Sequence, residues 1–178
     1  MFLIRRYNAA HAFEYATKWA LSRNPLFYDF SQIGGDCTNF ISQCVLAGTC
    51  QMNYDKTNGW YYVSADERAP SWTSVQFFYD FITQNKSIGP FGREIPVSDA
   101  QIGDIVQLGR RDGTFYHSLL VTSRTRRSLF VTAHSDDALN RPLRSYSYRR
   151  IRCIRIDGAN IVADSPDCFN DLLNGISL

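Results

Sequence analysis

The chain lacks the long apolar run, the internal repeat and the low-complexity segment that would mark a membrane, repeat or disordered protein. Its first residues turn from apolar to charged at Arg5 and Arg6, too soon for a secretory leader. We therefore expect no membrane span. The sequence fits either a cytoplasmic protein or a mature or excised domain whose leader has been removed.

An excess of one charge is also missing, because 19 Lys and Arg oppose 17 Asp and Glu, for a net charge of +2. So small a net charge gives no strong global field, and we expect no nucleic-acid partner. Apolar residues make up 44% and aromatic residues 14% of the chain, which is enough for a packed core and too much for a disordered protein. We expect residues 1–178 to form one domain.

Cysteines are few and odd in number. The five cysteines include no Cys-x-x-Cys pair, so the usual spacing of a structural zinc site is missing. An odd count also does not suit the disulfide framework of a small secreted domain. We therefore expect free, mostly buried thiols in a reducing compartment. The cysteines expected to be inert are Cys44, Cys50, Cys153 and Cys168.

Helical periodicity fills the first half of the chain, and strand-like runs fill the second. Asn8 is a candidate cap for a first helix that ends at Asn24-Pro25. Asp36 should cap a second helix that begins at Cys37 and stops at Gly48. Further helices are expected at 73–83 and at the end of the chain, where a short last helix would end near 174–175. Strands are expected at 105–108, 118–122, 129–133 and 150–156. This order predicts an α+β domain with N-terminal helices packed on an antiparallel β-sheet.

Cys37 follows a glycine pair, Gly34-Gly35, that lets the backbone turn sharply into the second expected helix. The positive end of a helix dipole favours thiolate over thiol, and a thiolate is the nucleophile of cysteine hydrolases. A helical cysteine is more often a small apolar core residue. A nucleophile also needs a base and a group that orients the base, so Cys37 is a candidate nucleophile whose partners must be found.

The expected hairpin between strands 118–122 and 129–133 brings together two of the three histidines. With its turn near Arg126, residue 117 lies opposite residue 134 or 135, where Cβ atoms are ~4.5–5.5 Å apart. We predict that His117 is the general base and that His134, or Asp136 nearby, orients it. A slip of one residue in the register would flip the face on which a side chain lies.

The remaining site residues are predicted by type. The oxyanion would be held by the backbone N–H of Cys37 and one further donor. The side-chain candidates for that donor are Gln32, Asn39 and Gln43. A group of aromatic residues either lines the substrate cleft or packs the core between helices and strands. These residues are Trp60, Tyr61, Tyr62 and Trp72.

Eight segments carry a family resemblance. They are 7–16, 24–30, 34–44 (GGDCTNFISQC), 60–62, 71–73, 101–107 (QIGDIVQ), 117–118 (HS) and 133–136 (AHSD). Together they resemble the bacterial putative amidase domain family. That family is similar to papain-like cysteine hydrolases and, within these, to cell-wall endopeptidases and amidases. The resemblance extends to about Ile156. One departure follows Gly48, where the family tends to have a second glycine and this chain has Thr49-Cys50.

The resemblance implies a papain-like fold and a cysteine-dependent hydrolase that cleaves amide bonds through a thioester acyl-enzyme. It implies that Cys37 is the nucleophile, His117 the base and His134 the third member, with Asp136 as the alternative third group. The implied substrate is a peptide or a small amide, with bacterial cell-wall peptides among the candidates. The implied chemistry needs no metal and no other cofactor.

Two other hypotheses compete with the hydrolase. Cys37, His117 and His134 are also of zinc-ligand type and would suit a metal site. The second half of the chain is rich in arginine, with Tyr146 and Tyr148 interleaved, which would suit a non-catalytic module that binds an anionic polymer. We favour outward strand and turn positions for these arginines. They are Arg110, Arg111, Arg124, Arg126, Arg127, Arg141, Arg144, Arg149, Arg150, Arg152 and Arg155.

Overall fold

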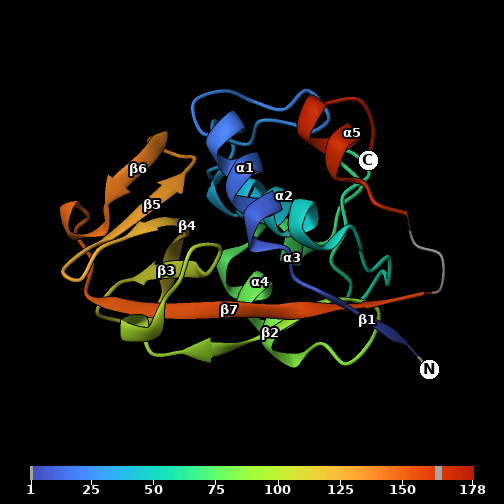
Figure 1. The fold of residues 1–178 in the computed structure, drawn as a ribbon. Coiled ribbons are helices and arrows are strands. Elements are labelled where there is room, and N and C mark those ends of the chain that lie inside the picture. The colour runs from blue at the N-terminus through green and yellow to red at the C-terminus, as the bar shows by residue number, and fades with distance from the viewer. Residues whose placement is uncertain (1, 163–165) are drawn as a thin grey trace.

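Figure 1 shows the computed structural model, which describes residues 2–162 and 166–178. Seven antiparallel strands form one sheet in the order β1-β7-β3-β4-β5-β6, and β2 also pairs with β7. The strands are β1 (Leu3–Arg6), β2 (Gly89–Ile95), β3 (Ile105–Gly109), β4 (Phe115–Arg124), β5 (Leu129–Ala133), β6 (Ala138–Pro142) and β7 (Arg150–Ile161). This sheet, together with the helices, confirms the predicted α+β class.

The helices are α1 (Ala9–Trp19), α2 (Cys37–Thr49), α3 (Pro70–Thr73), α4 (Val75–Gln84) and α5 (Phe169–Asn174). The short 3₁₀ helices are η1 (Val97–Asp99) and η2 (Leu143–Ser145). The predicted cap of α1 is confirmed, because the Asn8 side chain accepts a hydrogen bond from the backbone N–H of His11. Within the described residues, no helix is both long and apolar enough to cross a bilayer.

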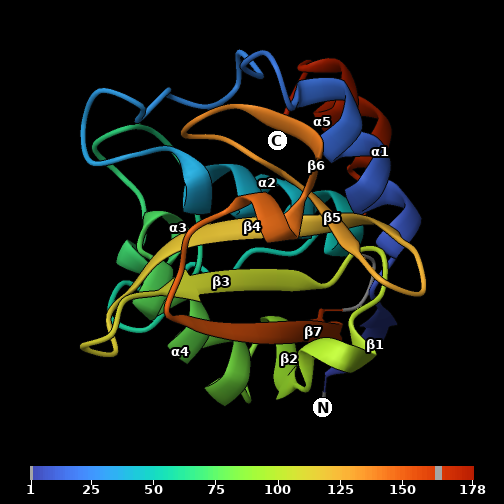
Figure 2. The ribbon, with the colours of Figure 1, turned by 90° about the vertical axis from the view of Figure 1, so that its left-hand side faces the viewer.

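The N-terminal helices lie on one face of the sheet, with α2 between α1 and the strands (Figures 1 and 2). Every residue of α2 is buried. Phe40 and Ile41 of α2 share a core with Ile105, Leu120 and Ile154 of the sheet. Removing these side chains from water is the main favourable contribution to folding, and it fixes α2 against the strands.

A second core lies on the opposite face of the sheet. It contains Val106, Leu119, Val131 and Cys153, each fully buried, and Tyr146 packs against it. Since successive side chains of a strand point to opposite faces, one strand supplies both cores. The near-continuous apolar runs of β3 and β4 follow from this double burial.

The register of β4 and β5 confirms the predicted hairpin. Leu120 pairs with Thr132, and Val121 pairs with Val131. Continued along the strands, this register puts residue 117 opposite 135 and residue 118 opposite 134, the second of the two expected alignments. Residues 117 and 134 are therefore offset by one, and their side chains point to opposite faces of the sheet.

The sequence does not predict three of the strands, β1, β2 and β6. β1 contains two arginines after two apolar residues, and its pairing with the end of β7 joins Leu3 to Ile161. β2 contains glycine and proline, which weaken a strand signal. Gly92 in β2 has a specific reason, since a Cβ atom there would collide with the Arg155 carbonyl. α1 also ends at Trp19, before the predicted stop at Asn24-Pro25.

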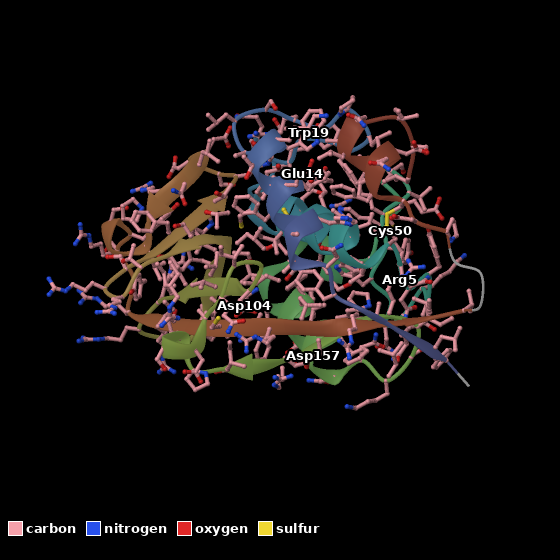
Figure 3. All side chains as sticks on the ribbon, viewed as in Figure 1. Arg5, Glu14, Trp19, Cys50, Asp104 and Asp157 are labelled. Atoms are coloured by element: carbon pink, nitrogen blue, oxygen red, sulfur yellow. A yellow bond between two sulfur atoms is a disulfide. The ribbon has the colours of Figure 1, made fainter. Side chains whose placement is uncertain are left out.

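A disulfide joins Cys50 at the end of α2 to Cys168 at the start of α5 (Figure 3). The expectation that these two cysteines are free thiols is wrong. The argument for a reducing compartment, which rested on free thiols, is therefore not supported. Their separation of 118 residues gave no signal in the sequence. Cys50 has a φ of 49°, a left-handed conformation that glycine favours, at the C-cap of α2.

Candidate active site

Cys37 is the first residue of α2, as predicted. The backbone enters the helix through Gly34 and Gly35, whose φ values of 90° and 107° suit glycine and strain other residues. Asp36 precedes Cys37 as the N-cap residue, but its side chain makes no capping hydrogen bond. The carboxylate of Asp36 instead accepts hydrogen bonds from the Phe30 backbone and the Asn39 side chain and faces His134.

The sulfur of Cys37 lies where α2 meets β4, and Cys37 is only 8% exposed. Burial raises the pKa of the Cys37 thiol. The backbone N–H of Ser118 and the hydroxyl of Thr38, whose Oγ1 lies 3.8 Å from the sulfur, act in the opposite direction without cancelling the effect of burial. The net direction is opposite to that expected from the helix dipole alone, so the resting group is a thiol.

His117 lies on β4 and is 8% exposed. The centroid of its ring lies 5.8 Å from that of Tyr146. Burial lowers the pKa of His117 to about 4, the charge of Asp136 opposes this shift, and Arg141 adds to it. The imidazole is therefore neutral at neutral pH, which is the form that accepts a proton as a general base.

Cys37 and His117 are held on neighbouring segments through the residues that follow them. Thr38 Oγ1 lies 3.1 Å from Ser118 Oγ. Among the described residues, no hydrogen bond joins the Cys37 sulfur directly to the His117 ring. Ser118 faces α2, so the His117 side chain before it points to the other face of the sheet, towards Tyr146. The structure therefore does not bring the Cys37 sulfur and the His117 ring together, and their pairing stays a prediction.

His134 faces α2 and not His117. Its Nδ1 lies 2.6 Å from Asp36 Oδ2, its Nε2 lies 2.9 Å from the carbonyl oxygen of Trp19, and its ring stacks on Phe40 at a centroid distance of 3.9 Å. The His134 and Asp36 side chains are each 1% exposed. The expected contact between the two histidines is therefore absent from this structure, because the register puts their side chains on opposite faces.

Asp136 lies in the turn after β5 and carries the charge that acts on His117. Ser135 and Asp136 have φ values of 60° and 65°, which cost backbone energy in residues other than glycine. The Tyr146 hydroxyl is buried and has no hydrogen-bond partner among the described residues. Nothing in the sequence signalled that Tyr146 lies beside His117.

The amide of Asn39 is fully engaged in the core. Its Nδ2 donates to the Tyr28 carbonyl and to Asp36 Oδ1, and its Oδ1 accepts from Trp72 Nε1 at 2.9 Å. Asn39 therefore has no free donor for an oxyanion, because the second residue after Cys37 on a buried helix points inward. The predicted donor role does not hold for Asn39.

Gln43 is also a core residue, since its Oε1 accepts a hydrogen bond from the Tyr15 hydroxyl at 2.8 Å. Gln32 is exposed in the turn that leads to Gly34, and it stays a predicted donor. The backbone N–H groups in the first turn of a helix lack partners within the helix, which suits the N–H of Cys37 to the same task.

The aromatic residues pack the core. Trp60 and Trp72 are fully buried, with ring centroids 4.6 Å apart, and Tyr61 and Tyr62 are 9% and 4% exposed. The Nε1–H of Trp60 donates to Ser42 Oγ of α2 at 3.1 Å. The prediction that these residues line a substrate cleft is therefore wrong for Trp60 and Trp72. The contiguous apolar surface of α2 explains why they are drawn inward.

The metal hypothesis finds no support in the described ranges 2–162 and 166–178, where no three His, Cys, Asp or Glu side chains are placed to hold a metal ion. Cys37, His117 and His134 point to different surroundings, and the two nitrogens of His134 are already engaged.

Two of the arginines that suggested a binding module hold the fold together. Arg152 is 8% exposed, and its guanidinium lies 3.5 Å from the ring centroid of Tyr79 and 3.9 Å from that of Phe115. Arg155 forms an ion pair of 2.7 Å with Asp104. The outward position expected for Arg152 is wrong, because these rings bury it.

The family model described as "Putative amidase domain" matches residues 6–156, so α5 lies beyond the match. The chain is similar to two proteins of Bacillus subtilis (strain 168). Uncharacterized protein YjcM is 30% identical over 147 residues, which is 78% of this chain and 33% of the relative. Uncharacterized protein YhbB is 28% identical over 147 residues, which is 80% of this chain and 45% of the relative. The chain thus spans less than half the length of these relatives, and no solved structure gives a significant match.

Proposed function

The chain belongs to the putative amidase domain family, and from that premise we propose that it is a cysteine-dependent amide-bond hydrolase of papain-like type. In this proposal Cys37 is the nucleophile, His117 is the general base and Asp136 orients His117. His134 is the alternative third member. Residues 1–178 act as one catalytic domain.

One observation carries the proposal: a cysteine at the start of a buried helix lies beside the strand that holds a neutral, buried histidine. The link runs through Thr38 and Ser118, whose hydroxyl oxygens are 3.1 Å apart. Asp136 is favoured over His134 as the orienting group because its charge acts on His117, whereas both ring nitrogens of His134 have other partners.

The first half of the reaction forms the acyl-enzyme. Burial raises the pKa of Cys37 and lowers that of His117, so the resting pair is neutral and the proton moves as the sulfur attacks. A carbon–sulfur bond forms at the amide carbonyl, and the resulting oxyanion is held by the backbone N–H of Cys37, with Gln32 as the proposed second donor. The carbon–nitrogen bond then breaks, and His117 gives its proton to the leaving amine.

The second half of the reaction releases the acid. His117 takes a proton from a water molecule as the water attacks the thioester carbonyl. The carbon–sulfur bond breaks, the carboxylic acid leaves, and the proton returns to the Cys37 thiolate. The proposed substrate is a peptide or a small amide, with cell-wall peptides as the first class to test.

The test is hydrolysis of a panel of peptide amides and cell-wall peptide fragments by the wild-type chain and its variants. We expect Cys37→Ala and His117→Ala to lower kcat by roughly 10³-fold or more while circular dichroism stays unchanged. Cys153→Ala is the matched control, because it removes a buried free thiol on the other face of the sheet. Retention of hydrolysis by a folded Cys37→Ala variant would exclude the proposal.

A further inference from the structure

Asp36 ties the start of α2 to the preceding loop and to the end of β5. Its Oδ1 accepts hydrogen bonds from the backbone N–H of Phe30 and from Asn39 Nδ2, each at 2.9 Å. Its Oδ2 faces His134 Nδ1 at 2.6 Å, and its own backbone N–H donates to Ser135 Oγ at 2.8 Å. The residue before Cys37 is thus fixed to the preceding loop, to its own helix and to the end of β5.

An arginine and a histidine lie beside this carboxylate. Arg23 Nε lies 3.7 Å from Asp36 Oδ2, although Arg23 is shared with Asp29 and Asp137. His134 has acceptor oxygens at both ring nitrogens, Asp36 Oδ2 on one side and the Trp19 carbonyl on the other. Both contacts are satisfied when both nitrogens carry hydrogen, which makes the ring cationic and the buried pair neutral in sum.

We propose that His134 and Asp36 form a positioning pair for the nucleophile: Asp36 fixes the start of α2, and His134 neutralises the carboxylate that stands one residue from the Cys37 sulfur. This inference rests on the proposed role of Cys37. It gives His134 a function without contact with substrate or with the His117 ring.

The neutralisation is needed because Asp36 lies so close to Cys37. The Asp36 charge is among the causes that raise the pKa of the Cys37 thiol. A buried carboxylate without its cation would oppose thiolate formation more strongly, since a like charge in a buried site disfavours ionisation. Removing His134 alone therefore harms the nucleophile, whereas removing both charges does not.

The experiment measures the rate of Cys37 alkylation by iodoacetamide at one neutral pH, with peptide mapping to assign the modified thiol. His134→Gln keeps a hydrogen-bond donor but removes the positive charge, and we expect it to slow alkylation about tenfold. The double variant Asp36→Asn/His134→Gln removes both charges, and we expect alkylation within about threefold of the wild-type rate. If His134 had only a structural role, adding Asp36→Asn to His134→Gln would not restore the alkylation rate of Cys37.

The matched control is Asp104→Asn, which breaks the ion pair between another buried carboxylate and the partly exposed Arg155, at a distance of 2.7 Å. It should lower stability without changing the Cys37 alkylation rate. If His134→Gln does not fold, the alkylation rate of Asp36→Asn tests the inference by itself. We expect Cys37 in this variant to be alkylated at least as fast as in the wild-type chain. A folded His134→Gln variant alkylated at the wild-type rate, or an Asp36→Asn variant slowed tenfold, would overturn the inference.

The proposed function can fail separately. If alkylation at Cys37 leaves amide hydrolysis intact, Cys37 is not the nucleophile, whatever the rates in the variants. If alkylation abolishes hydrolysis but the charge variants leave its rate unchanged, the positioning pair alone is refuted.

Discussion

Thr38 Oγ1 lies 3.1 Å from Ser118 Oγ, so the residue after Cys37 is hydrogen-bonded to the residue after His117. Gln107 Nε2 donates to the same Ser118 oxygen at 3.1 Å. The Ser118 hydroxyl is then free to donate to Thr38, and the Thr38 hydroxyl to the Cys37 sulfur 3.8 Å away. This chain of donors couples the sheet to the proposed nucleophile.

Thr38→Val tests this chain, because it removes the hydroxyl while nearly keeping the side-chain shape. The Thr38 hydroxyl lowers the pKa of Cys37, so its loss should raise that pKa further and reduce kcat about tenfold, with KM nearly unchanged. The lost hydrogen bond should cost about 1 kcal/mol of unfolding free energy. Steady-state kinetics and urea denaturation provide both readouts.

A second hydroxyl pair in the same sheet supplies the control. Thr122 Oγ1 and Thr132 Oγ1 also lie 3.1 Å apart and are buried, and their other hydrogen-bond partners are Phe130 and Asn140 and not Cys37 or His117. Thr132→Val should lower stability by a similar amount and leave kcat unchanged. Equal kinetic effects of the two variants would contradict a role of Thr38 at the sulfur.

The buried His117 should make the protein sensitive to acid. Its pKa falls from 6.5 to about 4 on folding, so between these values the unfolded chain binds a proton that the folded chain does not. This destabilisation is therefore absent above pH 6.5, and the free energy of unfolding declines as the pH falls towards 4. The loss amounts to about 3 kcal/mol at the acid end of this range.

Urea denaturation of wild type and His117→Gln across this pH range measures the effect. Glutamine does not titrate, so the difference between the two stability curves should change by about 3 kcal/mol and level off outside the range. A difference that does not vary with pH would show that His117 is not buried as a neutral ring.

Asp136 and Arg141 should shift the titration of His117 in opposite directions. Asp136 raises the pKa of His117, so Asp136→Asn should lower it further, whereas Arg141→Gln should raise it. Nuclear magnetic resonance of the imidazole ring protons follows both. If Asp136 is also the orienting group, Asp136→Asn should reduce kcat by roughly tenfold or more, and Arg141→Gln should not. An unmoved His117 titration in the Asp136 variant would remove Asp136 from the site.

The Cys50–Cys168 disulfide should stabilise the fold by tethering α5 to the end of α2. Reductant should lower the unfolding free energy of the wild-type chain by about 2–5 kcal/mol, because a long loop in the unfolded state is no longer closed. The double variant Cys50→Ser/Cys168→Ser should show the lower value with or without reductant. Insensitivity of the wild-type chain to reductant would show that this bond does not form or does not matter.

Local signals allowed much of this structure to be predicted. The glycine pair and Asp36 marked the start of α2, and Asn8 marked the start of α1, because caps and turns act over a few residues. The position of the turn near Arg126 also limited the hairpin to two neighbouring alignments. These features need no information from distant parts of the chain.

The features that were missed depend on distant partners. The Cys50–Cys168 bond and the pairing of β1 with β7 join opposite ends of the sequence. The His134–Asp36 contact depended on a single position in the register, since alignment with residue 135 and not 134 moved His134 to the other face. Residue type alone predicts Asn39 and Trp72 as site residues, whereas packing in the core joins them to each other by a hydrogen bond.

The most direct measurement of the central claim is limited alkylation of the native chain followed by assay of the same sample. The chain has three free cysteines, of which Cys44 and Cys153 are fully buried and Cys37 is 8% exposed. We predict that iodoacetamide in limiting amount labels Cys37 first, and that the fraction of amide hydrolysis lost equals the fraction of Cys37 labelled. Full labelling of Cys37 with undiminished hydrolysis would contradict the assignment of Cys37 as the nucleophile.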